Sequence, residues 1–443
     1  MTGPWRGLAF GVALGLVACD GPPQATPPPG PAAPSSTPSV AAPIEAGPPQ
    51  PRLSWLEREL RAGDDRWLDW LARAPELRLQ ILVTLVAPDR PWQTHELRVD
   101  AEYFYPASAI KTFLAVGALR IMNRRAGEGE QAEIHPRTLI RRCRRDKPDC
   151  WPPRPDEEEE DPASTPRDEG VEEEKKKHRK LRVKSEVHNL LSYSDNDSYN
   201  RLWDVAGHRE INEEMGRFGF PEVRFHHRMN APADKSRRTL RVLLLPPGKR
   251  AIVVKRRQSD LELAATPAAG LAIGKGHNRG GKLVDEPLDF NTMNYVSLRD
   301  LQRLNVALLY PERKGVVSLG LTDDQRDYVV AAMTRRLKQA KHAAVHGPLS
   351  PGVLEVLPHE RVRYIGKSGR AYGFHLENAY LEDRRTGRAL FVTVTVYANP
   401  NGILNDDDYG YDDTTKPMLA SLGAVLTRKW LAPAQAPVTD GGP

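Results

Sequence analysis

The sequence predicts an α/β domain in which one antiparallel sheet is built from both ends of the domain and covered by helices. Strand patterns stand near both ends, at 77–87 and 95–100 and again at 373–383 and 389–399. The segment between them is mostly helical in pattern. With 443 residues, 40% of them hydrophobic, a sizeable core is possible, and a net charge of +6 is too small at this length to indicate a nucleic-acid partner.

The first 52 residues have the features of an export signal and a tether. Residues 1–19 contain an apolar run, Leu8 to Ala18, that is too short to span a bilayer as a mature helix. The run ends at Cys19 and resembles a bacterial lipoprotein signal, in which that cysteine is lipidated. An ordinary secretory signal with a stray cysteine is the alternative. Residues 20–52 are Pro-rich and predict a disordered linker. We therefore expect a lipid-anchored, periplasm-facing protein of the bacterial cell envelope.

Residues 53–433 are predicted to form the folded domain, and 434–443 a disordered tail. Helical periodicity marks seven segments: 53–74, 109–124, 198–207, 209–219, 297–310, 324–340 and 416–431. Two insertions interrupt the domain. Residues 125–184 carry blocks of like charge (DEEEED, KKKHRK) and are predicted to be mostly disordered. The basic insertion 221–290 contains two apolar strands around a Pro-Pro-Gly turn, which predicts a hairpin at 241–256.

Two cysteines, Cys143 and Cys150, bracket a short Pro-containing loop. Because export places the chain in an oxidising compartment, we predict a disulfide between them, with two free thiols as the alternative. The Cys and His residues lack the spacing of a zinc site, so we expect no metal and no other cofactor.

The first chemical motif is SAIK, from Ser108 to Lys111, at the start of a hydrophobic helix. Residues i and i+3 of a helix share a face, so the serine hydroxyl and the lysine amine can lie within hydrogen-bond reach. A serine is a poor nucleophile unless a neighbouring base accepts its proton, and a neutral lysine can do so. Alone, this spacing is common on solvated helices.

Two further motifs follow in order along the chain. SDN, from Ser194 to Asn196, lies between two helical stretches and would alone be a helix N-cap. KSG, from Lys367 to Gly369, precedes a strand pair, and its glycine permits close approach of a ligand to the backbone. Together the three motifs resemble the active-site set of the penicillin-recognising serine enzymes, and their context resembles the class A β-lactamases.

That resemblance implies a β-lactamase/transpeptidase-like fold and a role for each residue. Ser108 would be the acylated nucleophile, Lys111 its proton acceptor, and Ser194 the relay that protonates the leaving nitrogen. The backbone N–H groups of Ser108 and Arg370 would form the oxyanion hole. A Lys367 ammonium about 4 Å from Lys111 would repel it by about 4 kcal/mol, which is about three pKa units. The substrate-binding set would be Asn196, Lys367, Ser368, Gly369 and Arg370.

The sequence departs from the class A pattern at one point. Those enzymes use a glutamate, in the pattern Glu-x-x-Leu-Asn, to activate the deacylating water, and no such string occurs here. The nearest candidate is Glu286 in EPLDFN, which could equally be a surface residue before a turn.

The expected function is thus a serine hydrolase, acylated at Ser108 by a β-lactam or a related amide that it then hydrolyses. Two alternatives stay open. One is a D,D-carboxypeptidase or penicillin-binding protein acting on peptidoglycan stem peptides. The other is a non-catalytic envelope protein that has kept the fold. We expect a monomer in each case.

Overall fold

A computed structural model describes the chain in five stretches, residues 53–127, 133–143, 181–231, 233–338 and 347–433. The predicted signal peptide, lipidated Cys19, Pro-rich linker and C-terminal tail lie outside these stretches. The same holds for Cys150, so its disulfide with Cys143 stays a prediction.

The central sheet is antiparallel and has the strand order β2-β1-β13-β12-β10, with β11 pairing to β12 after β10 ends. Strands β1 and β2 come from the beginning of the domain and the others from its end, so the predicted fold class is confirmed. Nearly every residue of β1 and β13 is buried, which explains their continuous apolar sequences. The strands are β1 (Gln80–Ala87), β2 (Arg90–Leu97), β10 (Val362–Gly366), β11 (Gly369–Ala371), β12 (Phe374–Asp383) and β13 (Ala389–Tyr397).

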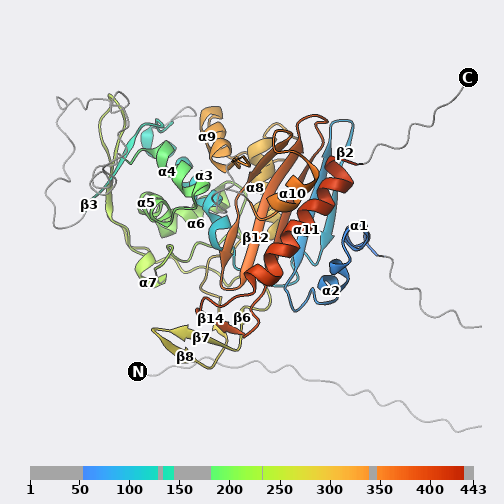
Figure 1. Cartoon of the computed structure of the whole chain (residues 1–443). Helices are drawn as coiled ribbons and strands as arrows, with labels where there is room; N and C mark the ends of the chain where they lie inside the picture. The colour runs from blue at the N-terminus through green and yellow to red at the C-terminus, as the bar shows by residue number, and fades with distance from the viewer. Residues whose placement is uncertain (1–52, 128–132, 144–180, 232, 339–346, 434–443) are drawn as a thin grey trace, which may run out of the picture. The chain divides into compact units, whose positions relative to one another are not determined.

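Helices pack on both faces of this sheet, and each face has its own hydrophobic core (Figure 1). Ile81 and Val83 of β1 enter one core and Leu82 enters the other, because successive side chains of a strand point to opposite faces. The first core is covered by α1 (Trp55–Gly63), α2 (Arg66–Ala72), α10 (Ser350–Val356) and α11 (Lys416–Leu426). The second contains α3 (Lys111–Ala126), α4 (Val183–Ser192), α5 (Asn196–Ala206), α6 (His208–Arg217), α8 (Leu298–Leu309) and α9 (Asp323–Met333).

The described parts of the two predicted insertions have regular structure. The predicted hairpin exists as β4 (Arg241–Leu245) and β5 (Ile252–Val254), and β3 (Leu139–Cys143) pairs with β4. Residues 133–143 of the insertion predicted to be mostly disordered are ordered, because the apolar Ile134 and Ile140 are buried in the second core. The charge blocks of that insertion lie outside the described residues.

Short elements complete the basic insertion and the C-terminal part. The hairpin of β7 and β8 pairs with β14 and not with the central sheet. The short elements of the two regions are α7 (Ala233–Ser236), β6 (Ala272–Ile273), β7 (Gly276–Arg279), β8 (Lys282–Val284), β9 (Leu288–Asp289), β14 (Ile403–Leu404) and two π-helical turns (Tyr411–Thr415, Thr427–Leu431).

Two segments of helical periodicity differ from the observed helices, one because it is divided and one because its helix ends early. The segment 53–74 is divided into α1 and α2 at Asp64, whose extended backbone closes α1. The segment 324–340 is helical only to Met333, because Thr334 forms a β-bridge with Ile365. None of the helices in the described stretches is long and apolar enough to cross a membrane.

Candidate active site

Ser108 lies in the tight turn that leads into helix α3. A 3-10 turn, η1 (Ala107–Ile110), precedes the helix, which begins at Lys111. Ala107 has a φ of 47°, a left-handed conformation that residues with a Cβ rarely adopt. Such a conformation costs about 1–3 kcal/mol and is found mostly at functional sites. Ser108 itself is half-buried between buried neighbours, so its hydroxyl is the accessible group of the turn.

The Lys111 amine is fully buried and faces the second motif. It donates hydrogen bonds to the Ser194 carbonyl oxygen (2.5 Å), to Asn196 Oδ1 (2.6 Å) and to Ser194 Oγ (3.3 Å). Burial lowers the pKa of Lys111 to about 8, an effect that the Asp195 carboxylate partly opposes. Within the described residues the Ser108 hydroxyl has no hydrogen-bond partner, and the Lys111 amine bonds to Ser194 and Asn196 instead.

Ser194 joins the two lysines of the site. It has a φ of 57°, and its hydroxyl oxygen accepts from Lys367 Nζ (3.0 Å) as well as from Lys111 Nζ (3.3 Å). A hydroxyl that accepts twice still has its own proton to donate, and here that proton can point to a ligand. The next residue, Asp195, caps helix α5 by accepting from the Ser198 backbone N–H (2.8 Å). The SDN motif is therefore both a helix cap and part of the site.

The Lys367 amine is the second buried amine of the site. Besides Ser194, it donates to the backbone carbonyl of Ser368 (2.9 Å). Burial lowers the pKa of Lys367 well below its usual value, and repulsion from Lys111 and Arg335 lowers it further. Anything that brings a negative charge to this position would raise that pKa again, because an opposite charge favours the protonated form.

Gly369 allows strand β11 to lie directly against the Ser108 turn. A Cβ at this position would be 2.2 Å from the Pro106 carbonyl oxygen and 3.1 Å from the Ser108 backbone nitrogen. Only a glycine fits such an approach. Arg370 follows in β11 and pairs with His375 of β12, so its backbone and that of Ser108 lie on neighbouring elements.

Two residues of the site, Arg335 and Glu377, were missed by the sequence reasoning. Arg335 Nη2 is 3.5 Å from Ser368 Oγ and 3.9 Å from Glu377 Oε1. Glu377 is fully buried in β12, and its Oε2 accepts from the Tyr364 hydroxyl (3.1 Å). Burial raises the pKa of Glu377. For Glu377 the sequence offered one local signal, a glutamate within a segment predicted to be a strand. For Arg335 it offered none.

The structure does not bring Glu286 together with Ser108. Glu286 is exposed between β8 and β9, and its backbone carbonyl lies 3.0 Å from His277 Nδ1. Its carboxylate makes no hydrogen bond or ion pair with any described residue. The hairpin before it pairs with β14 and not with a strand of the central sheet.

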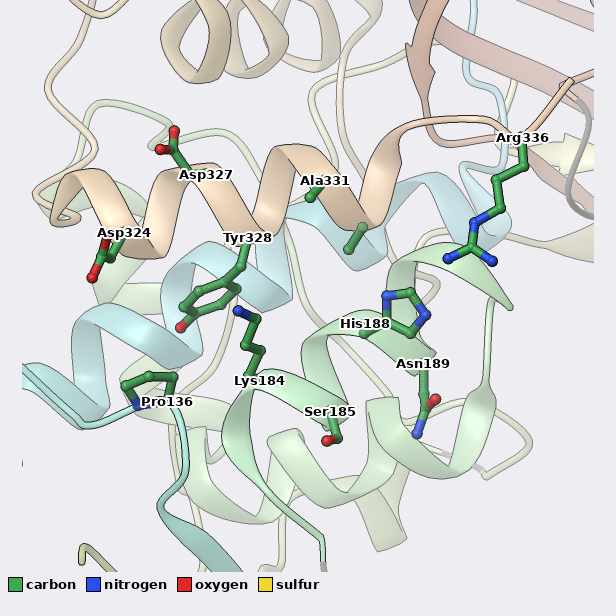
Figure 2. A pocket seen from close by; sticks show the side chains of 11 residues that line it. Pro136, Lys184, Ser185, His188, Asn189, Asp324, Asp327, Tyr328, Ala331 and Arg336 are labelled. Atoms are coloured by element: carbon green, nitrogen blue, oxygen red, sulfur yellow. The ribbon is translucent and has the colours of Figure 1, made fainter. Parts of the chain in front are cut away.

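A groove of about 750 Å³ runs between helices α4 and α9 (Figure 2). One end adjoins the site, because Arg336 follows Arg335 and its guanidinium extends toward His188. Lys184 and Asp327 place charges of both signs along the groove. Its lining is Pro136, Lys184, Ser185, His188, Asn189, Asp324, Asp327, Tyr328, Ala331, Ala332 and Arg336. Within the described residues, no group of three or more His, Cys, Asp or Glu side chains is placed to hold a metal ion.

Neither a family model nor a curated protein matches the sequence. Among solved structures, the chain is similar to a β-lactamase from Desulfarculus baarsii DSM 2075, with 14% identity and a TM-score of 0.45 over 84% of this chain and 96% of that chain. A class A β-lactamase from Clostridium kluyveri DSM 555 matches with 11% identity and a TM-score of 0.42 over 83% and 99%. A β-lactamase from Burkholderia vietnamiensis matches with 12% identity and a TM-score of 0.43 over 86% and 97%. At these values the likeness concerns the fold alone, and the chemistry below is argued from this chain's own side chains.

Proposed function

We propose that this protein is a serine hydrolase that is acylated at Ser108 by a β-lactam, or by a related amide that carries a carboxylate, and then hydrolyses the ester. The observation that supports the proposal is one hydrogen-bonded chain, Lys111 to Ser194 to Lys367, beside the turn that holds Ser108. A base, a hydroxyl relay and a buried cation are the groups that acyl transfer to a serine requires.

Acylation follows from these groups in two steps. Neutral Lys111 accepts the Ser108 proton while Oγ attacks the carbonyl carbon, and the backbone N–H groups of Ser108 and Arg370 stabilise the oxyanion. The C–N bond then breaks, and Ser194 donates its proton to the departing nitrogen. The proton on Lys111 replaces it along the 3.3 Å hydrogen bond, so both groups return to their starting states. The product is an ester on Ser108.

The carboxylate of the substrate would bind at the far end of the chain. Lys367 and Arg335 are buried there, Arg335 as a guanidinium cation and Lys367 as an amine that the carboxylate would keep protonated, and Ser368 adds a hydroxyl 3.5 Å from the guanidinium. Charge-assisted hydrogen bonds to a carboxylate contribute about 1.5–3 kcal/mol each, which selects an anionic substrate over a neutral one.

The charged groove between α4 and α9 favours a second candidate, a D,D-carboxypeptidase or penicillin-binding protein acting on peptidoglycan stem peptides. Such peptides carry charges of both signs and are long enough to extend beyond the scissile bond. Export, lipid anchoring at Cys19, periplasm-facing residence in the envelope and a monomeric state are further parts of the proposal.

The test is intact-mass spectrometry of the protein mixed with benzylpenicillin, sampled over time. We expect an adduct that forms and then decays while hydrolysed product accumulates. An adduct that persists supports the penicillin-binding alternative. The variant Ser108→Ala should show no adduct, while Ser318→Ala, at an exposed serine, should label like the parent protein. No adduct on the parent with any β-lactam contradicts the proposal.

A further inference from the structure

Hydrolysis of the Ser108 ester requires a group that takes a proton from water, and the Glu286 carboxylate is exposed and has no described contact with the residues around Ser108. The structure assigns this task to His227: we propose that its Nε2 activates the water that hydrolyses the acyl-enzyme. This inference rests on the proposed function and adds to it the residue that decides whether the acyl group is released.

The His227 ring packs on the segment that leads into the Ser108 turn. It stacks on Tyr105, with ring centroids 6.5 Å apart and planes 13° apart, and Tyr105 is three residues before Ser108. The backbone carbonyl of His227 accepts a hydrogen bond from the Tyr199 hydroxyl (3.4 Å) of helix α5. Asn196, the first residue of that helix, binds the Lys111 amine. His227 therefore contacts both the segment that leads to Ser108 and the helix whose first residue binds Lys111.

The hydrogen bonding of the ring leaves Nε2 as the basic nitrogen. Nδ1 is 2.7 Å from the Arg228 carbonyl oxygen, which can only accept, so Nδ1 carries the proton. Nε2 then has a free lone pair, and among the described residues it has no hydrogen-bond partner although the side chain is buried. Burial lowers the pKa of His227, so the ring is neutral at pH 7. A neutral imidazole with one unpaired nitrogen is the form that accepts a proton from water.

The backbone of this segment is fixed by one buried amide. Asn294 Oδ1 accepts from the backbone N–H groups of His226 (2.8 Å) and His227 (3.1 Å), and Asn294 Nδ2 donates to the His227 carbonyl (3.2 Å). Burial, and after it repulsion from His227 and His208, lowers the pKa of the neighbouring His226 to about 4. His226 Nε2 is likewise buried without a partner among the described residues, whereas the stacking on Tyr105 is made by His227, so His226 is a control one residue away for the placement of the ring.

Hydrolysis of the ester moves one proton from water to Nε2 and then to Ser108 Oγ. Nε2 of His227 takes one proton from water while the water oxygen bonds to the ester carbonyl carbon. The bond from that carbon to Ser108 Oγ then breaks, and the proton on Nε2 returns to Oγ. The products are the free acid and the original serine hydroxyl, with no further reactant.

The test measures acylation and deacylation separately in single turnovers with benzylpenicillin, followed by intact-mass spectrometry. The variants are His227→Asn, whose amide can still donate to the Arg228 carbonyl, and His227→Gln, which places a non-basic amide near Nε2. We expect acylation within about threefold of the parent protein and deacylation slower by about 10²–10⁴-fold, the usual contribution of a general base. His226→Asn should leave both rates unchanged. Thermal melting checks that each variant is folded.

Hydroxylamine separates a lost base from a distorted site, because this nucleophile needs no general base. It should release the acyl group from both His227 variants as a hydroxamate. Deacylation at the parent rate in folded His227 variants overturns the inference and leaves the proposed function standing. A parent protein that is acylated and never deacylates also overturns it, and a parent protein that is never acylated contradicts the proposed function itself. If neither variant folds, deacylation of the parent protein at the same rate with hydroxylamine as with water would overturn the inference.

Discussion

The buried Lys111 predicts the pH dependence of acylation. With a pKa of about 8, about one tenth of the amine is neutral at pH 7. At the ordinary lysine value of 10.5 the neutral fraction would be about one in 3,000, so burial increases the amount of active base about 300-fold. Because only the neutral amine accepts the Ser108 proton, acylation is lost as the pH falls through the pKa of Lys111.

The assay is the rate of adduct formation under single-turnover conditions between pH 6 and pH 9.5. We expect the rate to rise about tenfold from pH 6 to pH 7 and to level off above pH 8. The variant Lys111→Arg, which stays charged, should be slower by at least about 10²-fold. A rate that is constant across this range, or an active arginine variant, would refute the reasoning and place the base elsewhere.

A second variant tests the electrostatic part of that argument. Asp195→Asn removes the carboxylate that raises the pKa of Lys111 and keeps a residue that caps helices well. The midpoint of the acylation profile should therefore move below that of the parent protein. The shift will be modest, because the Asp195 side chain is partly exposed and solvent screens its charge. A midpoint that moves upward would contradict this account.

Two further predictions concern packing. Gly369→Ala should lose acylation by more than about 10²-fold in a protein that remains folded, because the added Cβ forces β11 away from the Ser108 turn and its oxyanion donors; labelling with benzylpenicillin measures this. Asp204→Asn should reduce the free energy of unfolding by about 3–5 kcal/mol, since Asp204 is buried and pairs with Arg228 (2.6 Å) and Arg142 (3.5 Å). Denaturant unfolding measures the loss, and a change below about 1 kcal/mol would show that the pair is not needed.

The sequence was sufficient to predict the sheet and the three motifs because these depend on local patterns. Alternating and continuous apolar runs located β1, β12 and β13, and the order of the motifs predicted which lysines would matter. The SDN motif could be interpreted from local chemistry in two ways, and both hold, since Asp195 caps α5 while its neighbours bind Lys111.

The residues that were missed reach the site through long-range contacts. Arg335 stood in a segment of helical periodicity, and it enters the site only because Thr334 pairs with Ile365 at the edge of the sheet. The choice of Glu286 assumed that position along the chain would place a carboxylate near Ser108. That region forms small sheets of its own, and in them the Glu286 carboxylate is exposed and has no hydrogen bond or ion pair with a described residue.

The site also has to keep two buried lysines in different charge states, and the substrate can supply that difference. Burial lowers the pKa of both lysines, and repulsion from Lys111 and Arg335 adds to the effect of burial at Lys367. A substrate carboxylate about 4 Å from Lys367 would stabilise its protonated form by about 4 kcal/mol, or about three pKa units. Lys111 shares the Ser194 hydroxyl with Lys367, so repulsion from a protonated Lys367 would favour its neutral form. Binding an anion would thus make Lys367 a cation and leave Lys111 a base, so a neutral amide should be a poor acylating agent even when it fits the cleft.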